Sequence, residues 1–475
     1  MLLNENLKAA ITAAGQEHVL RYFDELPPES QEKLAGQLAE VDFEALPALI
    51  DSYVLNRPVI EIPDDLAPAS YYPLCPADDA MAELYEKAFV KGEEIIRAGK
   101  CACLTVAGGQ GTRLGFDGPK GTYPIAPLSG KSIFSYFAGN ILRTQQKYGV
   151  TVDWYVMTSL LNNDATVAFF EENGYFGLKK DQVFFFSQGT MPAIGYDGKL
   201  LMSAKDSLSL SPNGHGGTLL ALRRSGALDR MKSQGVEAIS YFQVDNPLVP
   251  VADPLFIGLH TLTGSQMSAV MLAKTGPGEK LGNFCVSKGR LQIIEYSDLP
   301  QELANKTLPD GSLAYVAGSP AIHVIDRGFV ETLTDGGKLR LPWHRADKKI
   351  PTLDADGNAV TPAEPNGVKL ESFIFDALPL AEKTMVLECD RAEVFAPTKN
   401  PTGVDSVESC RAMLIARDLR RLAAAGVLLP CKDDGSYDCR VEIAPYLAID
   451  DEDVANLVAE RNICAIPAGA DVCIE

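Results

Sequence analysis

The sequence predicts an α/β protein in which a central mixed sheet lies between a helical N-terminal region and a small C-terminal domain. Three observations support this fold class. From residue 100, short β-rich runs alternate with helical patterns, which is typical of a largely parallel sheet with helices on both faces. Residues 2–55 instead carry apolar side chains at helical spacing. From about residue 400, a helical pattern at 406–425 precedes short mixed elements.

The length of the chain agrees with this three-part organisation, because 475 residues are about three times a usual domain. We expect residues 1–77 to form the helical N-terminal region, which ends in a proline-rich, extended connection at 57–77. Residues 78–396 are expected to form the central domain, and residues 397–475 the C-terminal domain.

The central domain is predicted to begin with a long helix at 80–98 and to continue as alternating strands and helices. Strands are predicted at 101–106, 152–158, 183–186 and 238–244. Helices are predicted near 132–148, 163–172 and 218–224. After residue 265, β-rich runs follow one another directly, at 268–273, 284–287 and 291–296. This change predicts an antiparallel or mixed portion of the sheet.

The charge and composition exclude several classes of protein. The chain carries 43 Lys and Arg against 63 Asp and Glu, a net charge of −20, which opposes non-specific contact with nucleic acids or anionic lipid. No apolar run is long enough for a membrane helix, and the N-terminus lacks the features of a secretory signal. The ten cysteines contain no C-x-x-C pair, and the five histidines form no zinc pattern. We therefore expect a cytoplasmic protein with free thiols and without nucleic-acid or membrane partners.

The strongest chemical signal is a glycine-rich loop directly after the strand at 101–106. It carries glycines at positions 108, 109, 111 and 115, together with Arg113 and Lys120. Glycine lets backbone N–H groups approach a phosphate closely, and both cationic side chains can donate to phosphate oxygens. The pattern predicts a phosphate-binding loop, and a tight strand-to-helix turn without a ligand is the alternative.

Two well-known phosphate loops do not fit this segment. A P-loop needs a glycine five residues before a Gly-Lys-Ser/Thr, and Ile125 occupies that position before residues 130–132. A dinucleotide fingerprint needs G-x-G-x-x-G, whereas this loop has three residues between Gly111 and Gly115 and lacks the later acidic residue. An NAD-dependent oxidoreductase is therefore a disfavoured alternative.

The loop instead resembles that of the eukaryotic-type UDP-sugar pyrophosphorylase superfamily. Further motifs follow in family order, among them those at 154–159, 184–189, 212–217, 244–246, 294–297, 348–351, 373–376 and 395–400. The UDP-N-acetylhexosamine (UDP-N-acetylglucosamine) branch is most similar. Two residues depart from it: His215 is more like the UDP-glucose branch, and Ile322 stands where that branch carries Asn. The resemblance implies a Rossmann-like nucleotidyltransferase domain.

The resemblance also implies a role for each candidate residue. Arg113, Lys120 and Lys399 would act on the β,γ-phosphates, the α-phosphate and the sugar phosphate. The nucleotide would contact Gly108, Gly109, Gly111, Gln188, Gly214 and His215, with the Gln188 amide at the uracil edge. For His215, capping of the following helix is an equal alternative. The sugar would contact Gly282, Glu295 and Ile322.

Asp245 ends an apolar run and is the expected Mg²⁺ ligand, since Mg²⁺ prefers oxygen donors. The alternative is a carboxylate that caps the next turn. Asp253 fits better as the N-cap of a helix that starts at Pro254.

The function implied is UTP-dependent uridylyl transfer to a sugar 1-phosphate, favouring N-acetylglucosamine 1-phosphate, with UTP and the sugar phosphate as small-molecule partners. The alternatives are glucose 1-phosphate or a broad sugar range. A non-catalytic UDP-sugar binding protein is the alternative from another class.

Overall fold

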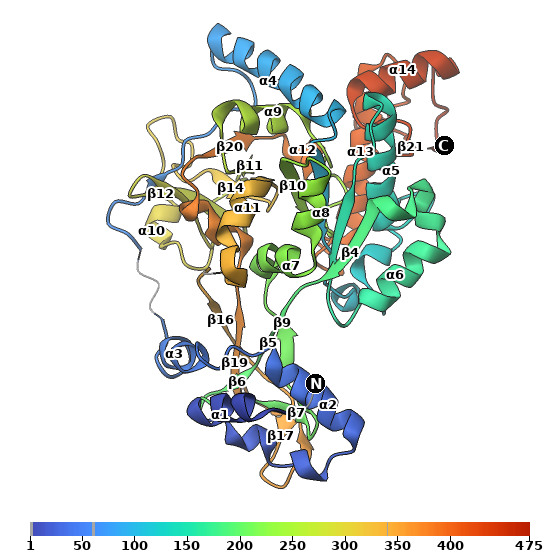
Figure 1. The fold of residues 1–475 in the computed structure, drawn as a ribbon. Helices are drawn as coiled ribbons and strands as arrows, with labels where there is room; N and C mark the ends of the chain where they lie inside the picture. Colours follow the sequence, from blue (N-terminus) through green and yellow to red (C-terminus); the bar gives the residue numbers. More distant parts are fainter. Residues whose placement is uncertain (1–2, 59–61, 340) are drawn as a thin grey trace. The chain divides into compact units, whose positions relative to one another are not determined.

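The computed structural model describes residues 3–58, 62–339 and 341–475. Residues 1–2 and 59–61, which belong to the predicted N-terminal region, lie outside the described residues, as does residue 340. The chain divides into two compact units, each treated by itself below (Figure 1). One unit comprises residues 1–62, 188–218 and 340–376, and the other residues 63–187, 219–339 and 377–475. The three-part division expected from the sequence stays a prediction.

The second unit is built on an 11-stranded mixed sheet, counted over the described residues. Its parallel part holds β10 (Ala238–Gln243), β2 (Cys101–Val106), β3 (Trp154–Thr158) and β4 (Val183–Ser187), in that order. β2 and β3 are almost completely buried, which explains why they are nearly continuous apolar runs. Because parallel strands end at one edge of a sheet, the segments that follow β2, β3 and β10 emerge at that same edge.

The rest of this sheet is mixed, as predicted for the chain after residue 265. β15 (His323–Asp326) runs antiparallel to both β10 and β11 (Met267–Ala273). The remaining strands are β14 (Ala317–Ser319), β12 (Gly282–Ser287), β1 (Ala67–Pro68), β13 (Arg290–Ile294) and β20 (Thr384–Glu388).

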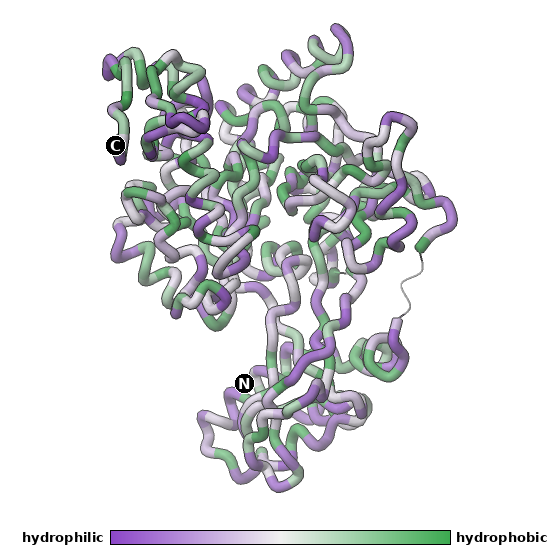
Figure 2. The backbone as a smooth tube through the Cα atoms, turned by 180° about the vertical axis from the view of Figure 1, so that it is seen from behind, coloured by the Kyte–Doolittle hydropathy of each residue, from purple (hydrophilic) through white to green (hydrophobic). Residues whose placement is uncertain are grey.

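The helices of the second unit include the predicted long helix, α4, and the helices between the strands. They include α4 (Asp79–Arg97), α5 (Ile133–Tyr148), α6 (Asn163–Glu172), α7 (Thr218–Arg224), α8 (Ala227–Ser233), α9 (Pro254–Thr263) and α11 (Arg327–Leu333). α4 packs closely on α9, because a Cβ on Gly258 would lie 1.6 Å from the Ala88 carbonyl oxygen. Asp253 caps α9 as predicted, accepting the Phe256 N–H at 3.0 Å. Figure 2 shows hydrophilic and hydrophobic stretches alternating along α4. None of the described helices is long and apolar enough to cross a membrane.

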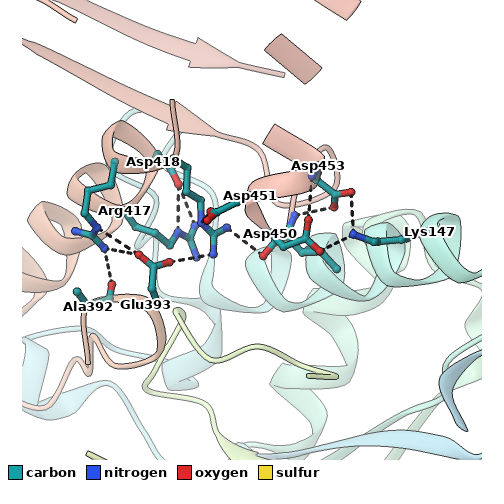
Figure 3. Close-up of polar contacts among 11 residues, drawn as sticks. Lys147, Ala392, Glu393, Arg417, Asp418, Asp450, Asp451 and Asp453 are labelled. Atoms are coloured by element: carbon teal, nitrogen blue, oxygen red, sulfur yellow. Dashed lines mark hydrogen bonds and ion pairs between the residues drawn. The ribbon is translucent and has the colours of Figure 1, made fainter. Parts of the chain in front are cut away.

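The C-terminal part of the second unit contains α13 (Val407–Ala424), β21 (Cys439–Ile443), α14 (Asp451–Arg461) and β22 (Ala470–Ile474), which confirms the helix predicted at 406–425. Ion pairs join α14 to α5 (Figure 3). Arg143 binds Asp453 at 2.7 Å, and Lys147 binds Asp450 at 2.6 Å. All ten cysteines are free, as expected.

The first unit packs helices against short strands. An apolar core that includes Ile11, Leu34 and Val368 joins its three chain segments. The helices are α1 (Glu5–Ala13), α2 (Pro28–Ala39) and α3 (Leu46–Ile50). The strands are β5 (Thr190–Pro192), β6 (Ile194–Gly195), β7 (Met202–Ala204), β8 (Ser207–Leu208), β9 (Leu210–Pro212), β16 (His344–Lys348), β17 (Thr352–Leu353), β18 (Ala359–Val360) and β19 (Gly367–Glu371).

Candidate active site

The glycine-rich loop presents a row of free backbone donors. Over the described residues, the N–H groups of Gly108, Gly109 and Gln110 donate to no protein acceptor. The loop closes behind them, since Gly111 N–H donates to the Gly118 carbonyl at 2.9 Å. A Cβ on Gly109 would meet open space, so this stretch of backbone is accessible to a ligand. Successive free N–H groups form an anion-binding concavity, which supports the predicted phosphate loop.

Lys120 and Asp245 meet beside this loop. The Lys120 ammonium lies 3.4 Å from the Asp245 carboxylate, and each side chain is 15% exposed. Lys120 N–H also donates to the Gly109 carbonyl at 3.1 Å, which joins the lysine to the loop. The segment that ends in Asp245 follows β10, parallel to β2, so both residues lie at the same edge of the sheet.

Lys399 is brought to this edge by its neighbour Thr398. The Thr398 N–H donates to the Asp245 carbonyl at 2.9 Å, and its hydroxyl donates to the same oxygen at 3.2 Å. Lys399 Nζ lies 5.6 Å from the centre of the Phe395 ring. The structure thus collects Lys120, Asp245 and the Lys399 segment, which are far apart in the sequence, at one place.

Two residues that the sequence did not single out hold this arrangement. Asn246, 4% exposed, accepts the Ala396 N–H at 2.9 Å and donates to the Val394 carbonyl at 2.7 Å. Asp405 accepts the Lys399 N–H at 2.6 Å through its carbonyl oxygen. Burial raises the pKa of the Asp405 carboxyl, and the positive charge of Lys399 partly offsets this effect. In the sequence, Asn246 stood out only as part of the motif at 244–246.

Arg113, unlike Lys120, lies on an exposed turn of the loop. It lies on a single turn, Thr112–Leu114, which ends at Gly115 with a φ of +68°. The side chain is exposed, and within the described parts of the chain no acidic partner binds it. Its guanidinium is therefore available to an anionic ligand.

The residues present fit the expected Mg²⁺ only as an ion that a single protein carboxylate holds together with substrate phosphates. No group of three or more His, Cys, Asp or Glu side chains that could hold a metal occurs among the described residues. Asp245 offers one carboxylate next to the free N–H row, and Mg²⁺ is commonly held by one or two carboxylates, substrate phosphates and water. The donor set therefore suits a cation that enters with a nucleotide.

Two of the three predicted sugar residues lie together. A Cβ on Gly282 would lie 3.5 Å from Glu295 Oε1. Ile322 instead packs in the apolar core of the unit and is 5% exposed, while its carbonyl accepts the Val270 N–H at 3.0 Å. The roles of these three residues stay predictions.

In the first unit, Gln188 lies next to the loop that contains Gly214. The Gly189 carbonyl accepts the Asn213 N–H at 3.1 Å, and β5 pairs with β9. Gln188 is 8% exposed, and its amide has no hydrogen-bond partner among the residues described. A nearly buried amide without a protein partner is a candidate to bind a ligand.

Gly214 and His215 are fixed by the segment that begins at Ser372. Gly214 has a φ of +85°, and a Cβ there would lie 2.3 Å from the Ser372 carbonyl oxygen, so glycine is required. His215 Nδ1 accepts the Ile374 N–H at 3.1 Å. Desolvation lowers the pKa of His215 to about 4, and His344 contributes. The neutral ring therefore carries its proton on Nε2.

Aromatic rings that the sequence analysis did not assign flank His215. Phe373 stacks on His215 with ring centres 5.2 Å apart and on His344 at 4.2 Å. His344 Nε2 lies 2.8 Å from the Asp376 carboxylate. Both roles expected for His215, contact with the base or sugar and capping of the following helix, stay predictions. The signal was the pair of phenylalanines in the motif at 373–376, whose rings lie 5.2 Å apart.

A mixed sheet whose parallel strands present a glycine-rich loop, a lysine and an aspartate just beyond a strand defines an α/β nucleotidyltransferase fold. The chain belongs to the UTP–glucose-1-phosphate uridylyltransferase family, whose model matches residues 77–425. The family resemblance expected from the sequence is confirmed.

Two relatives of the chain each cover most of its length. It is 37% identical over 441 residues to human UDP-N-acetylhexosamine pyrophosphorylase-like protein 1, with 90% of this chain and 87% of that protein covered. It is 34% identical over 442 residues to the UDP-N-acetylglucosamine pyrophosphorylase of Saccharomyces cerevisiae, with 89% and 92% covered. The crystal structure of the uridine diphosphate N-acetylglucosamine pyrophosphorylase from Trypanosoma brucei in complex with inhibitor matches with a TM-score of 0.84 and 25% identity, covering 98% of this chain and 97% of that chain.

Proposed function

We propose that the protein transfers the uridylyl group of UTP to a sugar 1-phosphate, with N-acetylglucosamine 1-phosphate as the favoured acceptor. The observation that carries this proposal is the row of free N–H groups at 108–110 beside the Lys120–Asp245 pair. Family membership supports it. A non-catalytic UDP-sugar binding protein would have no need for a lysine and a carboxylate next to the phosphates.

The chemistry requires charge neutralisation rather than a strong base. A phosphate oxygen of the sugar 1-phosphate attacks the α-phosphorus of UTP, a new P–O bond forms, and the bond to the β-phosphate bridging oxygen breaks with release of pyrophosphate. The nucleophile is already anionic, so in-line positioning and cationic groups supply the rate.

We assign the phosphates to the second unit. The N–H groups of the glycine-rich loop hold the triphosphate, Arg113 binds the β,γ-phosphates, and Lys120 stabilises the charge that builds on the α-phosphate. Lys399 binds the phosphate of the sugar. Mg²⁺ held by Asp245 would neutralise phosphate charge.

We assign the base to Gln188 and the Gly214 loop. The Gln188 amide donates and accepts at once, which matches the N–H and carbonyl edge of uracil. His215 is assigned to the base or the sugar as well. Gly282, Glu295 and Ile322 are assigned to the sugar, and glucose 1-phosphate stays the second candidate acceptor because His215 and Ile322 depart from the N-acetylhexosamine pattern. We place the reaction in the cytoplasm, where free cysteines are chemically stable.

Release of pyrophosphate tests the proposal directly. The protein is incubated with UTP, Mg²⁺ and one sugar 1-phosphate at a time, including N-acetylglucosamine, N-acetylgalactosamine, glucose and galactose 1-phosphates. We expect turnover with N-acetylglucosamine 1-phosphate and weaker turnover with glucose 1-phosphate. Turnover with glucose 1-phosphate alone would contradict the acceptor, and binding of UDP-sugars without any turnover would contradict the reaction.

A further inference from the structure

We propose that Asn162 is a positioning residue that sets the orientation of the phosphate-binding loop. The inference rests on the proposed function, because it assumes that the loop binds the phosphates of UTP. Asn162 itself would touch none of the reacting groups and would act only by orienting the loop. Asn162 follows β3 and lies at the edge of the sheet where the glycine-rich loop leaves β2.

The contacts of Asn162 run to the loop. Its side-chain amide donates to the Ala107 carbonyl at 2.9 Å and to the Gly109 carbonyl at 3.3 Å. Its Oδ1 accepts the Ser159 N–H at 2.8 Å and the Ser159 hydroxyl at 3.0 Å. The residue is fully buried, with 0% exposure. The Ser159 N–H fixes which amide atom is oxygen, so the NH₂ group faces the loop.

The helix that starts here does not explain the residue. Asn162 occupies the N-cap position of α6, where asparagine normally accepts a helix N–H through its side chain. Here the side chain makes no capping bond to α6. The asparagine thus stabilises the glycine-rich loop instead of the helix that it precedes.

The two carbonyl contacts orient two peptide groups. A trans peptide is planar, so its N–H points opposite to its C=O. Because the Ala107 and Gly109 carbonyls face Asn162, the N–H groups of Gly108 and Gln110 point away from it. These are two of the three free donors of the loop, so Asn162 holds them in one direction before a phosphate arrives.

The task requires the chemistry of asparagine. The side chain must donate to two carbonyl oxygens and accept an N–H at the same time. Aspartate has the same shape and keeps the acceptor, but its charged form cannot donate and would repel both carbonyl oxygens. Asn162→Asp is therefore a nearly isosteric test, and Asn162→Ala removes every contact.

The control is the next residue, which is also asparagine. Asn163 accepts from the Thr158 hydroxyl at 2.8 Å and donates to Asp164, with no bond to the loop. Asn163→Asp adds the same charge one position away. We measure UTP binding in the presence of Mg²⁺ by calorimetry, together with kcat, the KM for UTP and the melting temperature, for all four proteins.

We expect Asn162→Asp and Asn162→Ala to weaken UTP binding about tenfold and to raise the KM for UTP, while Asn163→Asp stays near wild type. Lowering the pH should restore UTP binding in Asn162→Asp relative to wild type at each pH, because a protonated carboxyl can donate to one carbonyl. Asn162→Ala should show no such recovery. A purely structural role would not produce this difference in pH profile.

Equal UTP affinity in wild type and Asn162→Asp would overturn the inference, as would equal losses in Asn162→Asp and Asn163→Asp. If neither Asn162 variant folds, Ser159→Ala removes one bond to Oδ1 and should weaken UTP binding in the same direction by a smaller factor, and unchanged binding would overturn the inference. Wild-type protein that binds no UTP would refute the proposed function as well, so the two failures are distinguishable.

Discussion

Replacement of Gly214 by alanine tests how the candidate base-binding loop is held. An alanine at a φ of +85° and a ψ of 166° enters a backbone region that is essentially restricted to glycine, at a cost of about 1–3 kcal/mol. Its Cβ would lie 2.3 Å from the Ser372 carbonyl oxygen and 2.7 Å from the Ser372 nitrogen, so the two segments must separate. Separation breaks the bond from Gly216 N–H to Ser372 and the bond from Ser372 N–H to Asn213, each worth about 1 kcal/mol. The total destabilisation is roughly 3–5 kcal/mol.

Gly226→Ala is a control variant at a glycine that also has a positive φ but lies in the left-handed region, with a ψ of 2°, and makes no such close contact. Gly226 has a φ of +79°, and a Cβ there would meet nothing within 4 Å. Gly226→Ala should therefore lose only about 1–2 kcal/mol. The chain has two tryptophans, Trp343 in the unit of Gly214 and Trp154 in the unit of Gly226. Tryptophan fluorescence during urea unfolding therefore reports on both units.

UTP binding supplies the second measurement. We expect Gly214→Ala to weaken UTP binding by about tenfold or more, because 1.4 kcal/mol of lost contact is a factor of ten, and Gly226→Ala to leave it unchanged. Equal stability losses in the two variants, with UTP affinity intact in both, would refute the reasoning. The close approach to Ser372 would then not be what fixes the loop.

Four further predictions concern charges and recognition. Lys120→Ala should lower kcat by more than it weakens UTP binding, because the α-phosphate gains negative charge in the transition state. Equal losses in the pre-steady-state rate and in UTP affinity would show that Lys120 only binds the substrate in the ground state. Asp245→Asn should raise the Mg²⁺ concentration needed for half-maximal activity, and full activity at low Mg²⁺ would remove Asp245 from the metal site. Gln188→Ala should relax the preference for UTP over other nucleoside triphosphates in competition assays. In the wild type, a wrong base would leave the Gln188 amide without hydrogen-bond partners, and the alanine variant loses this penalty. Burial opposes ionisation of Asp453, but hydrogen bonds from Arg143 and the charge of Lys147 outweigh it and lower its pKa. Asp453 therefore stabilises the fold above the usual carboxyl pKa, and this contribution is lost as the pH falls through the lowered value. Asp453→Asn should cost about 3 kcal/mol in urea unfolding at pH 7, and the difference from wild type should shrink as the pH falls from about 4 toward 2.

The parallel strands and the phosphate loop could be predicted because their signals are local. β2 and β10 are runs of apolar residues buried on both faces, and the loop glycines follow β2 directly. The helix cap at Asp253 is equally local, since it needs only a carboxylate three residues before an N–H. Such features depend on neighbours in the chain, and a single sequence contains them.

The partners of the candidate site could not be predicted, because they are separated by long stretches of chain. Asn246 binds Ala396, and His215 accepts from Ile374, at separations of 150 and 159 residues. Neither pairing leaves a pattern in one sequence, since an asparagine or histidine in a loop has many possible partners. The composition of the first unit from three separate segments was hidden for the same reason.

Ile322 shows why position alone does not establish a ligand contact. The family pattern puts a sugar-binding amide at this place, yet the Ile322 side chain packs against the apolar core with Val270 and Val324. The preceding residue, Ala321, has a φ of +60°, a conformation that asparagine and glycine adopt more readily than alanine. An amide at position 322 would be buried without a protein partner at a cost of about 1–3 kcal/mol, unless the ligand supplied that partner. An asparagine here would recover that cost when a sugar supplied the partner, whereas an isoleucine is stable without a ligand and offers a sugar only apolar contact, so the side chain at this position decides how strongly it can select the sugar.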